Sequence, residues 1–211
     1  MEEEGVDGVA RKTFPRKREV HEVAADNMLA RHEASTGVAV QLPIPIEAII
    51  EKTVGLSILY DKIPEPEDVM ILGALSPKTR TIVLNETHLD LLGEVVGPER
   101  FTLAHELGHW IYDADNPDQL SLPIDAPGEV FCYHRRHGGL EEDTQIREVN
   151  ANGFAAALLL PKGLIKGADI EKVLRNFRDT ARQWGVSQTT LRIRLEKLGL
   201  IDDTDAAMLQ M

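Results

Sequence analysis

The protein is 211 residues long, and 43% of its residues are hydrophobic while 27% are charged. This length allows one domain and at most a small appendage. The two fractions are typical of a globular protein and exclude a fibrous or wholly disordered chain. The net charge of −12 disfavours a general nucleic-acid-binding protein, because contact with phosphates depends on clustered lysine and arginine. A single cysteine, no secretory signal pattern and no long apolar run predict a cytoplasmic protein without membrane contact.

Helices and short strands are predicted in the first half of the chain. Apolar residues recur at helical spacing from Val20 to Ala34, and a second helix opens at Pro45 and ends near Gly55. Three short, branched, apolar segments follow at 57–60, 69–75 and 80–84, the last two joined by a turn at 76–79. A small sheet with one hairpin is therefore predicted, and an extended peptide could add to one of its edge strands.

The strongest helix signal begins at Pro98 and continues to about Ile111. About thirty residues rich in Asp, Pro and Gly follow at 113–144, which is the length of a functional loop rather than of a simple connection. The next helix is predicted at about 145–160, before Pro161. Three shorter helical segments and an acidic tail complete the chain.

The helix that begins at Pro98 carries the sequence His105-Glu106-Leu107-Gly108-His109, which has the form H-E-x-x-H. Positions i and i+4 share a helical face, so both imidazoles can bind one cation. Glu106 can take a proton from a water that the cation activates and deliver it to a leaving amine. The competing explanation is a helix whose two histidines are only buried and hydrogen-bonded.

A catalytic zinc site needs a third protein ligand. Glu148 is the candidate, because it lies on the next long helix and shares a face with Asn152, which could orient an imidazole as a second-shell partner. A solvated Glu148 is the alternative. Tyr112 and Asp115 stand where the metzincin pattern has glycine and histidine, which disfavours that pattern and leaves Asp115 as a weak substitute. Cys132 is more simply explained as a small core residue.

The long loop contains a group of residues that could contact the reacting peptide. His134 and His137 flank two arginines, and Tyr133 precedes them. These side chains could bind substrate or stabilise the negative charge of a tetrahedral intermediate. Ordinary surface histidines are the alternative.

Several segments resemble the ImmA/IrrE family of metallopeptidases: RFTLAHELGHW at 100–110, EVNANGFAA at 148–156, LLLP at 158–161, the hairpin segments 71–75 and 81–85, and residues 186–201. The resemblance covers about residues 40–201. It implies a bacterial or phage intracellular endopeptidase with a gluzincin-like site that cleaves helix-turn-helix repressors and so switches on stress or mobile-element genes. It also implies that His105, His109 and Glu148 bind the metal and that Glu106 is the general base. Asn152 stands where thermolysin-like sites have aspartate, and an amide orients histidine less strongly.

The segment near the C-terminus is basic, in contrast to the rest of the chain. Seven basic and three acidic residues between Glu171 and Leu200 give a local net charge of +4, so the remainder carries −12 − 4 = −16. Residues 178–198 have a helix-turn-helix outline in which Ser187 caps the second helix. Exposed side chains on that helix would contact DNA, namely Gln188, Thr189, Arg192 and Arg194. We favour packing or protein docking instead, because a net charge of +4 attracts DNA only weakly.

We therefore expect an α+β fold with a zincin-like metallopeptidase core, a small antiparallel or mixed sheet and active-site helices. The expected domains are a mobile charged tail at 1–19, the peptidase at 20–165, a helix-turn-helix-like segment at 166–201 and an acidic tail at 202–211. The expected function is hydrolysis of a protein substrate, a DNA-binding repressor, with zinc or with manganese or another divalent cation. The alternative is a DNA-binding or protein-binding regulator whose metal site is structural and catalytically weak.

Overall fold

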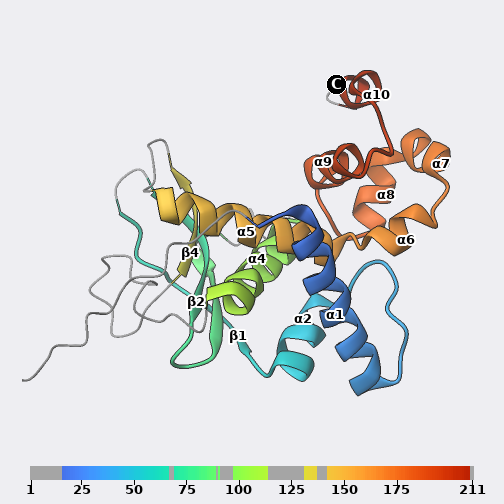
Figure 1. Ribbon diagram of the computed structural model, residues 1–211. Coiled ribbons are helices and arrows are strands. Elements are labelled where there is room, and N and C mark those ends of the chain that lie inside the picture. The colour runs from blue at the N-terminus through green and yellow to red at the C-terminus, as the bar shows by residue number, and fades with distance from the viewer. Residues whose placement is uncertain are drawn as a thin grey trace, which may run out of the picture.

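Helices and a mixed sheet form separate layers in this protein, as expected of an α+β fold (Figure 1). The computed structural model describes residues 16–66, 69–88, 90, 97–113, 131–136 and 142–209. The predicted N-terminal tail lies mostly outside these residues. No helix among those described is both long and apolar enough to cross a membrane. The predicted fold class is confirmed.

The described sheet has the strand order β1-β3-β2-β4. Its strands are β1 (Ser57–Asp61), β2 (Val69–Ser76), β3 (Thr81–Asn85) and β4 (Phe131–Arg136). The predicted hairpin is present, because β2 and β3 pair antiparallel, and β1 adds parallel to β3. Strand β4 corrects a prediction, since it lies in the segment expected to be a loop and pairs antiparallel with β2, with a register shift between Ile71 and Ala74.

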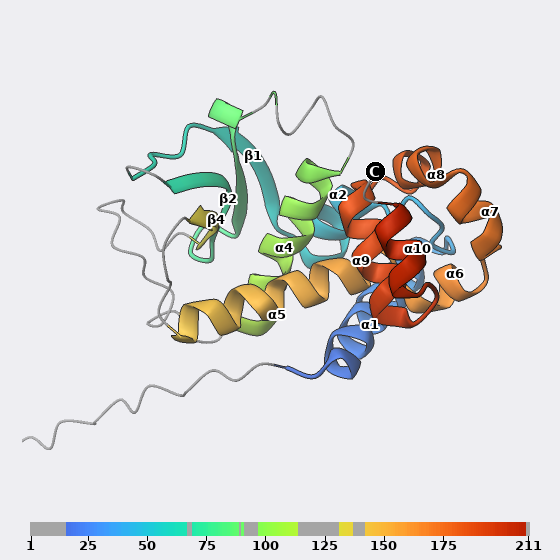
Figure 2. The same ribbon diagram turned by 90° about the horizontal axis from the view of Figure 1, so that it is seen from above.

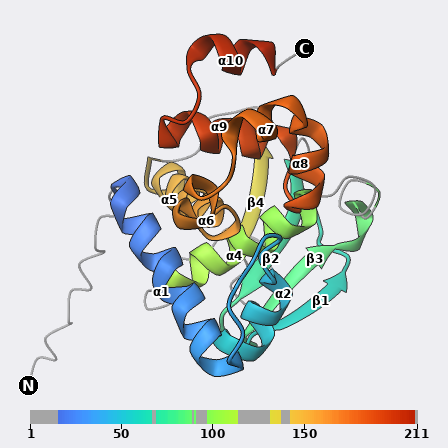
Figure 3. The same cartoon turned by 90° about the vertical axis from the view of Figure 1, so that its right-hand side faces the viewer.

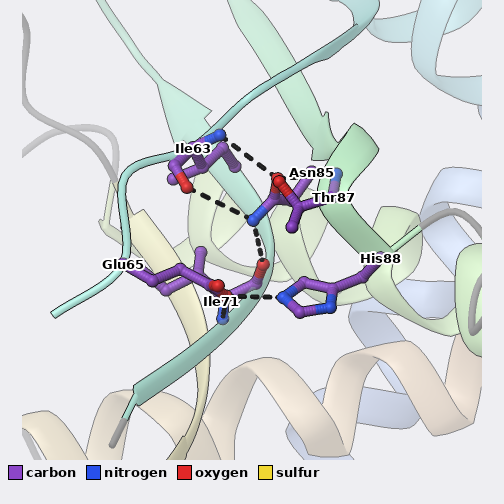
Figure 4. Close-up of polar contacts among 6 residues, drawn as sticks. All are labelled: Ile63, Glu65, Ile71, Asn85, Thr87 and His88. Carbon is purple, nitrogen blue, oxygen red and sulfur yellow. Dashed lines mark hydrogen bonds and ion pairs between the residues drawn. The ribbon is translucent and has the colours of Figure 1, made fainter. Parts of the chain in front are cut away.

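The end of β3 is tied to β2 by the fully buried side chain of Asn85 (Figure 4). Its side-chain amide donates to the carbonyl of Ile71 at 2.9 Å, and its side-chain oxygen accepts from the N–H of Ile63 at 3.2 Å. Nearby, Glu65 accepts from the N–H of Ile71 at 2.6 Å and from Nε2 of His88 at 2.7 Å. The bonds of Asn85 satisfy buried polar groups, and all four bonds together hold residues 63–65 against the ends of β2 and β3.

The predicted helices before the sheet are present. Helix α1 (Arg18–Thr36) begins slightly earlier than expected and ends at Gly37, which has the left-handed φ of 70° that favours glycine. Helix α2 (Ile46–Ala48) continues as the π-helix η1 (Ile49–Val54) and ends at Gly55. A short 3-10 helix, η2 (Glu86–His88), follows β3.

Two long helices, α4 (Pro98–Asp113) and α5 (Glu142–Leu159), form the centre of the molecule. Helix α4 lies between the sheet and α5, and α1 packs against α5 (Figures 2 and 3). Leu103, Ala104 and Leu107 of α4 are fully buried with Phe154 and Leu158 of α5. Burial of these apolar side chains fixes the position of the helix that carries the H-E-x-x-H sequence.

Short helices gather at one end of α5 (Figure 1). They are α6 (Lys162–Lys166), α7 (Ile170–Arg175), α8 (Phe177–Gln183), α9 (Gln188–Leu198) and α10 (Asp203–Met208). Helix α10 lies within the stretch expected to be an acidic tail. Ser187 caps α9 as predicted, because its side chain accepts from the N–H of Thr190 at 3.0 Å. Leu191 and Leu195 are buried beneath α9.

The predicted exposure of Arg194 on α9 is wrong. Its side chain is 3% exposed, and Nε donates to the carbonyl of Leu160 at 2.9 Å. The two terminal nitrogens donate to the two carboxylate oxygens of Glu22 at 2.6 and 2.8 Å. Arg192 is also partly buried and pairs with Glu196. A charged side chain can be buried in this way when its charge and its donors are all matched, so the basic face of α9 is smaller than the sequence suggested.

Candidate metal centre

Helices α4 and α5 touch through their backbones at Gly108 and Ala151. A Cβ atom on Gly108 would lie 2.9 Å from the Cα of Ala151 and 3.1 Å from its carbonyl oxygen. Any side chain at this position would therefore force the helices apart. Because the crossing is so close, side chains within one turn of it on each helix converge on the same point.

Three side chains meet beside this crossing. The Nε2 atoms of His105 and His109 are 3.0 Å apart, and the oxygens of Glu148 lie 3.2 Å and 3.4 Å from them. All three ligand atoms lie within 4.8 Å of one another. Ligands bound tetrahedrally to zinc at their usual bond lengths are about 3.3 Å apart. The arrangement therefore fits a cation held between the three side chains, two of which are fully buried.

The electrostatics of the cluster favour the protonation states that bind metal. Burial lowers the pKa of His105, because the charged imidazolium would lose its hydration. Burial alone would raise the pKa of Glu148, but hydrogen bonds with His105 and His109 outweigh it, and the pKa lies below its ordinary value. Neutral imidazoles and an ionised carboxylate are the forms that coordinate a divalent cation.

Asn152 lies where the helical spacing placed it, one turn after Glu148. Its side-chain oxygen is 3.0 Å from Nδ1 of His105. An amide oxygen accepts hydrogen bonds, so the imidazole proton is assigned to Nδ1 for the metal-binding form, in which Nε2 would coordinate a cation instead of donating to Glu148. The bond thus fixes both the tautomer and the orientation of His105.

Of the other predicted site residues, only Glu106 has a described side chain. Glu106 is fully buried on α4, next to His105. Tyr133 and His134 belong to β4, where the backbone of His134 pairs with Ile71, but their side chains lie outside the described part of the structure. His137 and the weak substitute ligand Asp115 lie outside the described residues altogether.

A second group of contacts, not predicted from the sequence, supports the crossing from the side of α1. Nδ1 of His21 is 2.9 Å from the hydroxyl oxygen of Tyr112 on α4. A Cβ atom on Gly153 of α5 would lie 2.6 Å from the His21 ring, so α1 and α5 are also in close contact. The guanidinium of Arg16 stacks over the ring of Tyr112 at 4.5 Å. In the sequence, this arrangement is indicated only by Gly153, a glycine in the middle of α5.

Comparison with known proteins identifies the family of the chain. A search of curated proteins gave no significant match. A solved structure of a Mycobacterium tuberculosis transcriptional regulator matches with a TM-score of 0.51 and 20% sequence identity, over 84% of this chain and 46% of that one. This likeness shows the fold, and the chain spans less than half of that regulator's length. Residues 55–196 match the model of the peptidase family described as the IrrE N-terminal-like domain, and this range includes the whole cluster of His105, His109 and Glu148. The chain therefore belongs to that family.

Proposed function

We propose that the protein is a metal-dependent endopeptidase in which His105, His109 and Glu148 hold a divalent cation and Glu106 is the catalytic acid and base. The observation that carries the proposal is the convergence of two imidazoles and a carboxylate: the two Nε2 atoms are 3.0 Å apart, and one oxygen of Glu148 lies 3.2 Å from His105 while the other lies 3.4 Å from His109. Two imidazoles and one carboxylate are a ligand set of catalytic zinc, and manganese or another divalent cation is also accepted by such a set.

The residues of the chain have distinct roles in the proposed hydrolysis. The bound cation would polarise the substrate carbonyl and acidify a water. Asn152 holds His105 in the tautomer that presents Nε2 to the site. Glu106 accepts the proton of the attacking water and delivers it to the nitrogen of the leaving amine. Burial of the cluster keeps bulk water away from these charges and strengthens their interactions.

An edge strand of the sheet offers a place for the substrate backbone. β4 pairs with β2 on one side, and it has no strand on its other side among the residues described. An extended peptide could add there through main-chain hydrogen bonds. We propose a DNA-binding repressor in the cytoplasm as the substrate, which is what the resemblance to repressor-cleaving peptidases implies.

The test compares the wild type with Glu106→Gln in two measurements, the metal content of the purified protein and the cleavage of a cognate repressor. We expect about one zinc per chain in both proteins, and a loss of cleavage by about 10²- to 10⁴-fold in the variant, because the proton carrier is removed while the ligands stay. Glu51→Gln, at an exposed position of η1, is the matched control and should keep full activity. A protein that stays inert after loading with zinc and with manganese would contradict the proposal.

A regulator with a structural metal site is the second candidate, favoured by the helix-turn-helix outline of α8 and α9. Gln188 and Thr189 are exposed at the start of α9, where DNA contacts would lie. Burial of Arg194 removes one of the expected phosphate contacts. A salt-dependent gel shift that Glu106→Gln leaves unchanged, together with absence of cleavage, would favour this candidate.

A further inference from the structure

A cavity of about 580 Å³ lies where the sheet, α4, α5 and α9 meet. Its volume is in the range of ordinary ligand sites, which is large enough for a bulky side chain of a bound peptide. The C-terminal helical segment closes it on one side, because residues of α9 line it together with residues of the metal-binding helices. The cavity is therefore shared between the peptidase core and the helix-turn-helix-like segment.

Most of the surface that lines the cavity is apolar. Met70 and Leu72 of β2, Phe101 of α4, Ala156 of α5 and Ile193 of α9 contribute hydrocarbon surface from every side. Among the described residues that line the cavity, Lys197 is the only charged one, and it is exposed. An apolar group would bury its surface here without leaving a charge unpaired.

The cavity lies beside the metal cluster and shares one residue with its surroundings. Asn152 lines the cavity, and the same side chain accepts the hydrogen bond from His105. Thr102 also lines it, four residues before Glu106 on the same face of α4, which is about 6 Å along the helix. Neighbouring residues of a peptide have Cα atoms about 3.8 Å apart. A side chain in the cavity is therefore within reach of a residue next to the bond that Glu106 would act on.

Helix α9 is held firmly as a wall of the cavity by contacts with the start of α4. A Cβ atom on Gly97 would lie 2.5 Å from the backbone nitrogen of Ser187, so the two backbones touch. Nε of Arg100 donates to the carbonyl of Gly185 at 3.0 Å. At the other end of α9, Arg194 is bound to Glu22. These contacts fix Ile193 relative to the catalytic helix.

We propose that this cavity is the specificity pocket for a large apolar side chain, Leu, Met or Phe, on the substrate residue next to the cleaved bond, and that Ile193 forms its outer wall. The inference rests on the proposed endopeptidase function and deepens it. The helix-turn-helix-like segment then selects the peptide to be cleaved.

The first experiment measures cleavage specificity. The zinc-loaded, full-length protein is incubated with tryptic peptides of denatured casein, and the new ends are identified by mass spectrometry. We expect Leu, Met or Phe at one fixed position beside the cleaved bonds. Ile193→Trp fills the pocket and should lower cleavage at these sites at least tenfold relative to sites with Ala or Gly, since one methylene in an apolar pocket changes specificity by about 10- to 200-fold.

Two further variants keep the result interpretable. Ala156→Phe fills the cavity from the opposite wall and should give the same change, even if Ile193→Trp fails to fold. Gln188→Trp adds the same bulk at an exposed position of α9 that does not line the cavity, and it should leave the preference unchanged. Cleavage without a preference, or a preference that both filling variants leave intact, overturns the pocket and leaves the peptidase proposal standing.

A binding experiment separates failure of the pocket from failure of the catalysis. In Glu106→Gln, N-acetyl-leucinamide should shift the methyl NMR signals of Leu72 and Ile193, whereas N-acetylglycinamide should not. If neither the casein peptides nor a cognate repressor is cleaved with zinc or manganese, the proposed function is overturned, and these shifts alone decide whether the cavity binds an apolar side chain. Absence of the shifts overturns the pocket.

Discussion

Two clusters of buried polar side chains join distant helices in this protein, and they are built in opposite ways. In the pair of Arg194 and Glu22, a cation meets an anion, and the guanidinium also donates to the carbonyl of Leu160. In the cluster of His105, His109 and Glu148, three groups that can each offer a lone pair point at one another. In the first cluster, the charges and donors are paired within the protein. In the second, the three ligand atoms are close enough together to hold a metal ion. The pair of Arg194 and Glu22 therefore has a structural role, whereas the three side chains of the other cluster could hold a metal ion.

The largest expected effect on stability comes from breaking the ion pair of Arg194 and Glu22. Arg194→Met leaves the largely buried carboxylate of Glu22 without its cation, so we expect the free energy of unfolding to fall by about 3–5 kcal/mol in urea titrations. Replacing both partners, Arg194→Met with Glu22→Leu, should restore most of this loss, because no buried charge remains. Arg175→Met, which removes an exposed pair with Glu171, is the control and should change stability by less than about 0.5 kcal/mol. A loss under 1 kcal/mol in the single variant would show that the pair is solvated.

Removal of one side chain from the cluster of His105, His109 and Glu148 should weaken metal binding rather than protein stability. Glu148→Ala deletes a proposed ligand, and we expect zinc affinity to fall by more than about 100-fold, beyond the effect of losing an outer-shell partner. Competition with a zinc-binding dye measures this. Glu171→Ala, an exposed glutamate on α7, should leave the affinity unchanged. Equal affinity in Glu148→Ala and the wild type would remove Glu148 from the ligand set.

The helix crossing beneath the cluster can be tested without changing any polar group. Gly108→Ala places a methyl group 2.9 Å from the backbone of Ala151, so we expect a loss of about 1–3 kcal/mol in unfolding free energy and a weaker metal site. Gly163→Ala is the matched control, because its Cβ would meet no atom within 4 Å. That variant should be neutral or stabilising by up to about 1 kcal/mol. Similar stability in both variants would mean that α4 and α5 can move apart at Gly108 with little loss of stability.

The smallest effect is expected from the residue that orients His105. Asn152→Ala removes the acceptor of the Nδ1 proton, and zinc affinity should fall roughly tenfold. Asn152→Asp should instead raise the affinity above that of the wild type, because a carboxylate orients and polarises imidazole more strongly. If the aspartate variant binds zinc no better than the alanine variant, the hydrogen bond does not tune the site.

The two clusters also differ in what the sequence could reveal. The spacing of His105 and His109 on one helix is fixed by helical geometry, so their meeting could be predicted from the sequence alone. Glu148 needed a second helix at the right distance, and that distance depends on the contact of Gly108 with Ala151, which no spacing rule encodes. Its place on the next long helix, one turn before Asn152, nevertheless made Glu148 the candidate, and the resemblance to a known family implied the same residue.

Two features could not be read from local patterns because long-range partners create them. Arg194 has the charge of an exposed residue, and its burial depends on a glutamate at the other end of the chain. Strand β4 is a short segment in a stretch rich in proline and glycine, and it forms a strand by pairing with β2. Tertiary contacts overrode local preference in both cases.

The pair of Arg194 and Glu22 also bears on the order in which the protein is completed. The two residues are 172 positions apart, so their contact closes nearly the whole chain into one loop. Helix α1 leaves the ribosome early, yet Glu22 gains its cation only after α9 has been synthesised. All members of the metal cluster lie between these two points. A truncated product that ends before Arg194 would therefore contain every residue of the cluster but lack the contact that fixes α1 over the completed fold.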